Sequence, residues 1–356
     1  MVSSYPESNR PPTGGVEVST RRLVGALAGA GVDVTVVAPG AASDDHDGVA
    51  RVIHVDCDPR LALLRRLRPW REAAARVLQE IDADVVHGQG LLASGLAVTD
   101  LRGRPRVVTA HGSHVKDTRA WRRRGLGTEA RIAIVERLSS AVVARADAVV
   151  SVHPDPAVNV PGRPRRFLYI PTIVDPAFTR EGTWHPVAGR VLYCGGPRRI
   201  KGWDLLADAW ERVVTAIPQA TLHIVGWPAD ESVPAAFAAA KVEPWLAPEA
   251  LREAFADAAL VVIPSRFEVA PVTLLDAWAA GVPVLATRTG GIPALAAGAA
   301  VLVDPLPDAL GEGIERILAG VVPTADLVAE GGRRAEAATA ERVAAAHLDL
   351  YDELLH

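Results

Sequence analysis

The most constraining feature of this sequence is a local rhythm that runs through the chain twice. A short run of β-branched residues is followed by a turn with glycine or proline, and then by an alanine- and leucine-rich stretch with helical spacing. Repetition of this order indicates βαβ units that build a parallel sheet. A single hydrophobic core stops growing at roughly 250 to 300 residues. In a chain of 356 residues the rhythm therefore predicts two α/β domains.

The predicted strands form two sets, one in each half of the chain. The first set comprises residues 32–38, 51–55, 84–87, 106–110 and 148–152, and the second comprises residues 190–194, 221–225, 260–264, 284–287 and 300–303. A proline- and glycine-rich stretch without periodicity separates the two sets, which is typical of an interdomain connection.

These sets define the predicted domain organisation. We expect an N-terminal domain over residues 1–170, a linker over 171–188 and a C-terminal domain over 189–335. Apolar residues recur at helical spacing near the end of the chain, so residues 336–356 predict an amphipathic helix that needs a surface to cover. We expect this helix to return to the N-terminal domain.

Composition excludes several classes of protein. Apolar residues make up 49% of the chain and charged residues 22%, which indicates a folded globular protein. No apolar run approaches the roughly 18 to 20 residues that cross a bilayer, and the first residues lack the features of a secretory signal. A cytoplasmic location is therefore expected. Cys57 and Cys194 are too few for a disulfide framework and predict reduced packing residues.

Charge is distributed unevenly along the chain. Residues 1–180 hold 25 basic against 19 acidic side chains, and the remainder holds 13 against 23. Arginines cluster in residues 59–76 and 118–125. A solvated helix face is the simpler interpretation. The alternatives are an anionic partner molecule or a reversible contact with a membrane surface.

Candidate binding residues follow the predicted strands, because open parallel sheets bind ligands at the carboxyl ends of their strands. Gly14 and Gly15 precede a predicted helix, where a backbone without side chains can approach an anion. His87 and His111 end strands and can donate hydrogen bonds or transfer protons. A purely structural role, as a simple turn or a capping histidine, remains the alternative for each.

The second half holds two further constellations. Arg198, Arg199 and Lys201 follow a strand and a glycine turn and enter a helix, a position from which cations can hold a diphosphate. In residues 264–295, the most specific stretch of the chain, Glu268 and Asp276 stand eight residues apart. That is ~12 Å of helical rise, which suits recognition of two ends of an extended ligand better than a shared proton.

The chain thus holds four candidate stretches: the glycine pair, the two histidines, the segment from Arg198 to Lys201, and residues 264–295. In this order they resemble the large family of retaining glycosyltransferases that includes the sucrose-phosphate synthases and bacterial mannosyl- and glucosyltransferases (group 1 glycosyltransferases, family 4). The resemblance covers essentially the whole chain. It implies the GT-B architecture, an α/β fold of two facing Rossmann-like domains with a central cleft. The N-terminal domain would bind the acceptor and the C-terminal domain the nucleotide-sugar donor.

The resemblance also implies roles for the C-terminal residues. Glu268 matches the family acid that holds the transferred sugar, and Asp276 matches the acid that holds the ribose, one methylene shorter. Lys201 matches the lysine that grips the diphosphate. Gly196 occupies the usual arginine position, so Arg198 or Arg199 would have to substitute.

Further donor contacts are implied by position in the family motifs. The segment around Glu268 matches a variant of the family loop, and its expected donor contacts are Ser265, Ala270, Pro271 and Val272. Contacts to the nucleobase are expected near Lys241 and Val242. In the first domain, Gly14 and Gly15 would lie under the donor phosphates. His111 would lie near the transferred sugar and join Glu268 and Lys201 as a catalytic residue.

The family further implies the reaction. A hexosyl-type sugar would pass, with retention, from a nucleoside-diphosphate sugar to an acceptor hydroxyl, in bacterial natural-product or cell-envelope glycan synthesis. The donor, a UDP- or GDP-sugar, is a substrate, and neither a cofactor nor a metal is expected. The acceptor would be a small molecule or lipid-linked, nucleic acid is not a partner, and basic N-terminal helices allow peripheral contact with the inner membrane face.

A nucleotide-sugar 2-epimerase or a phosphorylase on the same fold is one alternative. Three departures from the family motifs, at Gly196, Asp276 and Ala294, keep open another alternative, a nucleotide-sugar-binding subunit without catalysis.

Overall fold

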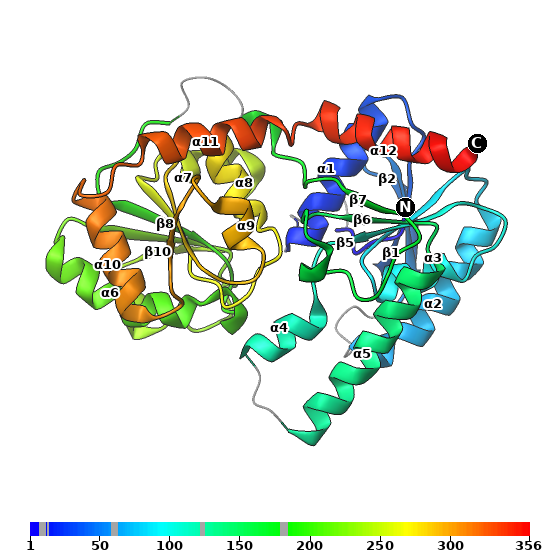
Figure 1. Ribbon diagram of the computed structural model, residues 1–356, viewed down its shortest axis with the longest axis horizontal. Helices are drawn as coiled ribbons and strands as arrows, with labels where there is room; N and C mark the ends of the chain where they lie inside the picture. Colours follow the sequence, from blue (N-terminus) through cyan, green and yellow to red (C-terminus); the bar gives the residue numbers. More distant parts are fainter. Residues whose placement is uncertain (7–11, 13, 58–62, 122–124, 179–183) are drawn as a thin grey trace. The chain divides into compact units, whose positions relative to one another are not determined.

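The computed structural model describes residues 1–6, 12, 14–57, 63–121, 125–178 and 184–356. It divides into two compact units, shown as ribbons in Figure 1. Unit 1 comprises Met1–Ile173 and Ala340–His356, and unit 2 comprises Val174–Thr339. Parts of the arginine clusters, residues 59–62 and 122–124, lie outside the described residues.

Unit 1 is built on one sheet whose two halves meet at Val2. The strands follow the orders β1-β3-β2 and β4-β5-β6-β7. Val2 forms parallel bridges to Val37 of β1 and to Gly88 of β4, which joins the halves. The strands are β1 Thr35–Gly40, β2 Ser43–His46, β3 Arg51–Asp56, β4 Val86–Gln89, β5 Arg106–Ala110, β6 Ala148–Ser151 and β7 Phe167–Tyr169.

Unit 2 is built on a second, wholly parallel sheet with the order β10-β9-β8-β11-β12-β13. Its strands are β8 Arg190–Cys194, β9 Thr221–Val225, β10 Lys241–Glu243, β11 Leu260–Ile263, β12 Val284–Thr287 and β13 Val301–Val303. The predicted α/β class with parallel sheets is confirmed. β2, which pairs antiparallel with β3, and the short strands β7 and β10 were not predicted.

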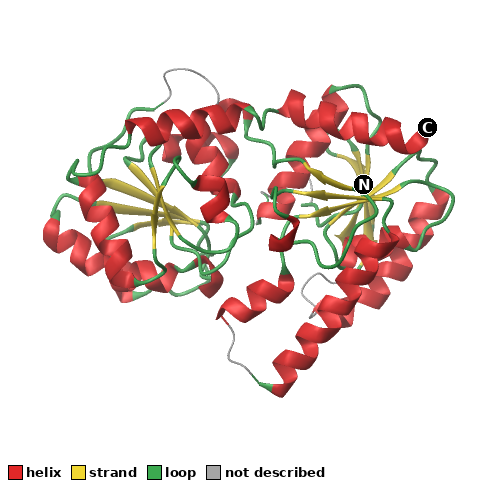
Figure 2. Ribbon diagram, viewed as in Figure 1, coloured by secondary structure: helices red, strands yellow, loops and turns green. Residues whose placement is uncertain are grey.

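Helices flank both sheets (Figure 2). In unit 1 they are α1 Gly15–Gly29, α2 Leu63–Glu80, α3 Ala93–Thr99, α4 His114–Trp121, α5 Leu126–Arg145 and α12 Ala340–Leu355. In unit 2 they are α6 Trp203–Ala216, α7 Pro248–Ala256, α8 Val272–Ala279, α9 Ile292–Ala296, α10 Pro307–Leu318 and α11 Ala325–Glu336. Within the part of the chain that is described, no helix has the length and apolar character that a membrane span requires.

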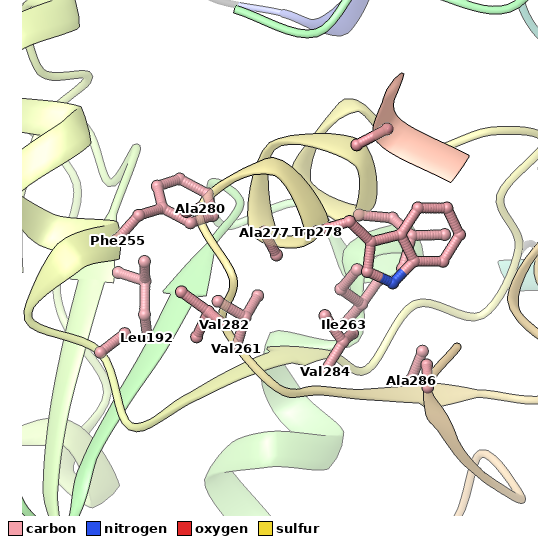
Figure 3. Packing of buried hydrophobic residues seen from close by; sticks show 14 of the residues in the cluster. Leu192, Phe255, Val261, Ile263, Ala277, Trp278, Ala280, Val282, Val284 and Ala286 are labelled. Atoms are coloured by element: carbon pink, nitrogen blue, oxygen red, sulfur yellow. The ribbon is translucent and has the colours of Figure 1, made fainter. Parts of the chain in front are cut away.

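The unit 2 sheet is buried on both faces, which explains why its strands are near-continuous apolar runs. On one face, Leu192, Val261 and Val284 of adjacent strands pack against Phe255 of α7 and Trp278 of α8 (Figure 3). On the other face, residues of α6 and α10 cover the alternate side chains of the same strands. A hydrophobic core on each face of the sheet therefore fixes the strands, and the polar residues of interest lie at their ends.

The predicted amphipathic helix at the end of the chain is α12, which packs beside α1 in unit 1 (Figure 1). His87 of β4 fixes it in place. The two ring nitrogens of His87 are hydrogen bonded to the Tyr351 hydroxyl at 2.6 Å and to the Thr109 hydroxyl at 2.7 Å. The His347 ring lies beside the His87 ring, with centroids 5.7 Å apart. Burial lowers the pKa of His87 well below its usual value, so the ring is neutral at pH 7. Its contacts with Tyr351, Thr109 and His347 fit the structural interpretation of this histidine.

Candidate functional site

Lys201 reaches its position through a turn that only glycine permits. After β8, residues Arg199–Lys201 form a single 3-10 turn, and Gly202 adopts the left-handed conformation with φ +72° before α6 begins. A Cβ atom on Gly202 would lie 1.8 Å from the carbonyl oxygen of Pro264. The backbone after β8 therefore touches the backbone after β11, the strand that pairs with β8.

Lys201, Glu268 and Ser265 form one polar cluster at these strand ends. The Nζ atom of Lys201 lies 2.5 Å from Oε1 of Glu268, and the Ser265 hydroxyl donates to the same oxygen at 3.0 Å. The Glu268 side chain is 14% exposed and that of Lys201 is 33% exposed. A cation and a carboxylate are thus held side by side with one face open to solvent.

The loop after β12 holds the Glu268 segment from the other side. Gly290 has φ +57°, and a Cβ atom there would lie 2.0 Å from the carbonyl oxygen of Glu268. That oxygen accepts a hydrogen bond from the Gly291 amide at 2.7 Å. The hydroxyls of Thr287 and Thr289 both donate to the Ser265 carbonyl, at 2.5 and 3.0 Å. Three neighbouring strand ends, those of β8, β11 and β12, therefore fix the main chain of this cluster.

Asp276 lies in α8 and is 3% exposed. Burial raises the pKa of the Cys194 thiol at the end of β8, and the charge of Asp276 adds to that effect. Pro271 precedes the first residue of α8, Val272, and Ala270 is half-buried in the same loop. The loop from Ser265 to Pro271 thus follows the carboxyl end of β11, and α8 then packs on one face of the sheet.

The remaining cations of unit 2 differ in their partners. Arg199 is exposed and paired with Asp204 at 3.0 Å. Arg198 is also exposed and forms no ion pair with any described residue. Lys241 begins the edge strand β10 and pairs with Glu243 at 2.8 Å, while Val242 packs against the core. The structure therefore brings Lys201, Ser265 and Glu268 into contact, whereas Arg198 and Lys241 form no hydrogen bond or ion pair with these three residues.

In unit 1, His111 follows β5 and donates from Nε2 to Oε1 of Gln89 at 2.7 Å. Burial, helped by the nearby His347, lowers the pKa of His111 to about 4. His111 is therefore a neutral hydrogen-bonding group at pH 7. Gly14 precedes α1, and a Cβ atom on it would meet nothing within 4 Å, while Gly15 is the first residue of that helix.

The described part of the arginine-rich helix α2 supports a solvated face. Arg68 pairs with Glu72 at 2.8 Å, and Arg71 pairs with Asp100. Two arginines of this cluster thus have acidic partners within unit 1.

Sequence reasoning missed two groups that support the site. Gln89 ends β4 beside His111, and the strand-end argument that found His111 would also have found it. Arg266, two residues before Glu268, binds Asp204 of α6, and no local signal marks that contact. Within the described ranges, no group of three or more His, Cys, Asp or Glu side chains is arranged to hold a metal ion.

The matches to protein-family models fall in the same two halves of the chain. The model of "Glycosyltransferase Family 4" matches residues 13–178, and that of "Glycosyl transferases group 1" matches residues 188–320. The chain belongs to these glycosyltransferases. The second match includes every residue of the Lys201–Glu268 cluster. Comparison with curated proteins gives no match.

Solved structures similar to this glycosyltransferase share its GT-B fold over nearly the whole chain. Sucrose-phosphate synthase from Thermosynechococcus elongatus is 23% identical, with a TM-score of 0.82 and coverage of 99% of this chain and 98% of that one. WaaG, a glycosyltransferase involved in lipopolysaccharide biosynthesis, is 17% identical, with a TM-score of 0.75 and 99% coverage of both chains. Anabaena Alr3699/HepE in complex with UDP and glucose is 15% identical, with a TM-score of 0.71 and 99% coverage of both chains.

Proposed function

We propose that this glycosyltransferase moves a hexosyl group, with retention, from a UDP- or GDP-sugar to an acceptor hydroxyl without a metal ion. The observation that carries the proposal is the contact between Lys201 and Glu268 at the carboxyl ends of β8 and β11. A sugar joined to a diphosphate needs both groups, a cation for the phosphates and a carboxylate for the sugar hydroxyls. The UDP and glucose in the HepE complex support this class of donor.

In the free protein Lys201 and Glu268 neutralise each other. Donor binding would exchange that ion pair for a lysine–phosphate contact and a carboxylate–hydroxyl contact. The exchange gives Lys201 a new charged partner and Glu268 new hydrogen-bond donors, so neither charge is left without a partner. An intact nucleotide sugar carries sugar and diphosphate in one molecule and so satisfies both groups at once, which favours it over a free sugar.

The proposed reaction is a front-face substitution. The bond from the anomeric carbon to the phosphate oxygen breaks while the acceptor oxygen bonds to the same face of that carbon. The acceptor proton passes to the departing phosphate, and the nucleoside diphosphate leaves. Lys201 stabilises the charge that develops on the diphosphate, and the protein otherwise acts by positioning the reactants.

Other residues take supporting roles in this proposal. Asp276 would bind the ribose, and Arg198, which has no ion partner among the described residues, is a better substitute for the missing arginine than Arg199. Nδ1 of His111 would accept a hydrogen bond from a hydroxyl of the transferred sugar, since the lowered pKa keeps the ring neutral and its one N–H donates to Gln89. Gly14 and Gly15 would lie under the donor phosphates.

The acceptor and the cellular setting form part of the same proposal. We propose a small-molecule or lipid-linked acceptor in bacterial natural-product or cell-envelope glycan synthesis. The protein would work in the cytoplasm, with basic helices of unit 1 able to contact the inner membrane face.

The test begins with a thermal-shift screen of UDP-, GDP-, ADP- and dTDP-sugars, because a ligand that binds the folded state raises its apparent stability. With the donor identified, Lys201→Ala and Glu268→Gln should each lower kcat/KM by about 10² to 10³. Arg316→Ala, which removes an exposed cation paired with Glu312 on α10, serves as the control. Unchanged kinetics in both site variants would remove the cluster from the reaction.

The rival functions give different products. An epimerase would convert the donor without any acceptor, and a phosphorylase would require inorganic phosphate. A binding subunit would bind the donor and neither hydrolyse nor transfer it. NMR of the product's anomeric proton distinguishes retention from inversion.

A further inference from the structure

Arg266 links the two loops that carry Lys201 and Glu268. Its Nη1 and Nη2 atoms donate to the two carboxylate oxygens of Asp204 in the first turn of α6, at 2.5 and 3.0 Å. Nη1 also donates to the carbonyl oxygen of Arg199 at 2.7 Å, and the Arg266 amide donates to the carbonyl oxygen of Ile200 at 2.8 Å. One residue thus makes four hydrogen bonds to residues 199–204.

The pair is shielded and stays charged. The side chain of Asp204 is 15% exposed and that of Arg266 is 22% exposed. Burial alone would raise the pKa of Asp204, but hydrogen bonds from Arg266 and Arg199 outweigh it and hold the pKa below its usual value. A two-point contact between a planar guanidinium and a carboxylate fixes orientation as well as distance.

The loops that carry Lys201 and Glu268 also lie next to each other beside the Arg266–Asp204 contact. Lys201 follows the two residues whose carbonyl groups Arg266 binds, and Gly202 touches the backbone of Pro264. Glu268 lies two residues beyond Arg266. The Arg266 side chain binds Asp204 and the Arg199 carbonyl, and it forms no hydrogen bond or ion pair with Lys201 or Glu268.

We propose that Arg266 and Asp204 are a positioning pair for the transfer reaction, which holds Lys201 and Glu268 at the spacing that a sugar diphosphate requires. The inference rests on the proposed function and adds to it the residues that set the geometry. Neither residue touches the donor. Loss of the pair lets the turn that carries Lys201 shift against the Glu268 loop, and shifts of about 1 Å at a reacting centre cost up to 10²-fold in rate.

The experiment compares Asp204→Asn, Arg266→Lys and Arg266→Ala with Arg212→Ala. Arg212 is the matched control, because it too joins α6 to another element, through an ion pair with Glu315 of α10. Five quantities are measured for each variant: the melting temperature, kcat, the donor KM, and the dissociation constants of UDP and of GDP by titration calorimetry.

We expect Asp204→Asn and Arg266→Ala to lower kcat by about 10- to 100-fold at a temperature where both remain folded. The nucleoside diphosphate should bind several-fold more weakly, because Lys201 is misplaced. Arg266→Lys keeps the charge and the melting temperature but does not restore kcat, since an ammonium group cannot bind both Asp204 oxygens and the Arg199 carbonyl together. The double variant Asp204→Asn/Arg266→Ala should be no worse than Arg266→Ala, and Arg212→Ala should match the wild type.

The inference is overturned if the folded Asp204→Asn and Arg266→Ala proteins keep wild-type kcat and nucleotide affinity. It is equally overturned if Arg266→Lys restores kcat in full, or if Arg212→Ala loses as much activity as Arg266→Ala. Failure of the proposed function would look different, because Lys201→Ala and Glu268→Gln would then also leave activity and nucleotide binding unchanged.

Discussion

Replacement of His347 by leucine should make unit 1 less sensitive to acid. His347 lies in α12 against His87, is 3% exposed, and is hydrogen bonded through Nδ1 to the Val343 carbonyl at 2.8 Å. Its Nε2 atom is buried and has no hydrogen-bond partner among the described residues. Burial lowers the pKa of His347 from 6.5 to about 4, because the interior offers nothing to solvate an imidazolium.

The sign and size of the effect follow from proton linkage. Below pH 6.5 the unfolded chain binds a proton at this residue that the folded chain does not, so stability is lost as the pH falls from 6.5 towards 4. For a pKa lowered from 6.5 to about 4, the loss is about 2 kcal/mol at pH 5. His347→Leu removes this loss. It should also stabilise unit 1 at pH 7.5 by about 1 kcal/mol, because a buried polar atom without a partner is removed.

Hydrogen exchange of the α12 amides, measured by mass spectrometry at pH 7.5 and pH 5 and corrected for intrinsic rates, reports the local stability of this helix at each pH. A local probe is needed because two units can unfold separately. His356→Gln, which changes an exposed histidine just beyond the same helix, should behave like the wild type. Equal loss of protection in the wild type and in His347→Leu between the two pH values would refute the reasoning.

Four further substitutions test other parts of unit 2. Gly202→Ala should cost more than the ~1–2 kcal/mol of a left-handed alanine, because its Cβ also meets a carbonyl oxygen at 1.8 Å; a melting temperature equal to that of the wild type would contradict this. Gly331→Ala should destabilise the α11–α8 contact, where the new atom would lie 2.3 Å from an indole ring, whereas Gly332→Ala has open space and should stabilise by roughly 0.5–1 kcal/mol; thermal melts that rank the two variants in the opposite order would disprove the packing. Asp276→Ala should weaken nucleotide binding by about tenfold if the ribose contact exists, and an unchanged dissociation constant by calorimetry would exclude that contact.

The central strands could be predicted because burial on both faces leaves a clear mark on their composition. The runs at Arg190–Cys194, Thr221–Val225 and Val284–Thr287 were predicted with the bounds that the structure has. β2 and β10 were missed for the opposite reason. Ser43–His46 is polar and Lys241–Glu243 is only three residues long, so each is a strand because its neighbour supplies the hydrogen bonds.

In the site, too, residues with a local sequence signal could be predicted, whereas residues whose role depends on partners distant along the chain could not. Lys201 and Glu268 could be named because each follows a predicted strand, and Lys201 also follows a glycine turn. Arg266 could not, since an arginine in a loop is usually solvated and its partner Asp204 is 62 residues away. His87 illustrates the greatest separation, because its Tyr351 partner is 264 residues away along the chain. Only the packing of α12 decides its role.

Unit 1 is made of two segments that are separated along the chain, and this has a consequence during protein synthesis. Unit 2 is continuous, so it can fold as soon as its own residues have left the ribosome. Unit 1 must wait for the 16 residues of α12, which are made after all of unit 2. Until then the apolar residues of unit 1 that cluster with Val343, Ala344 and Leu350 of α12 lack the cover of that helix, and completion of the unit 1 core depends on it.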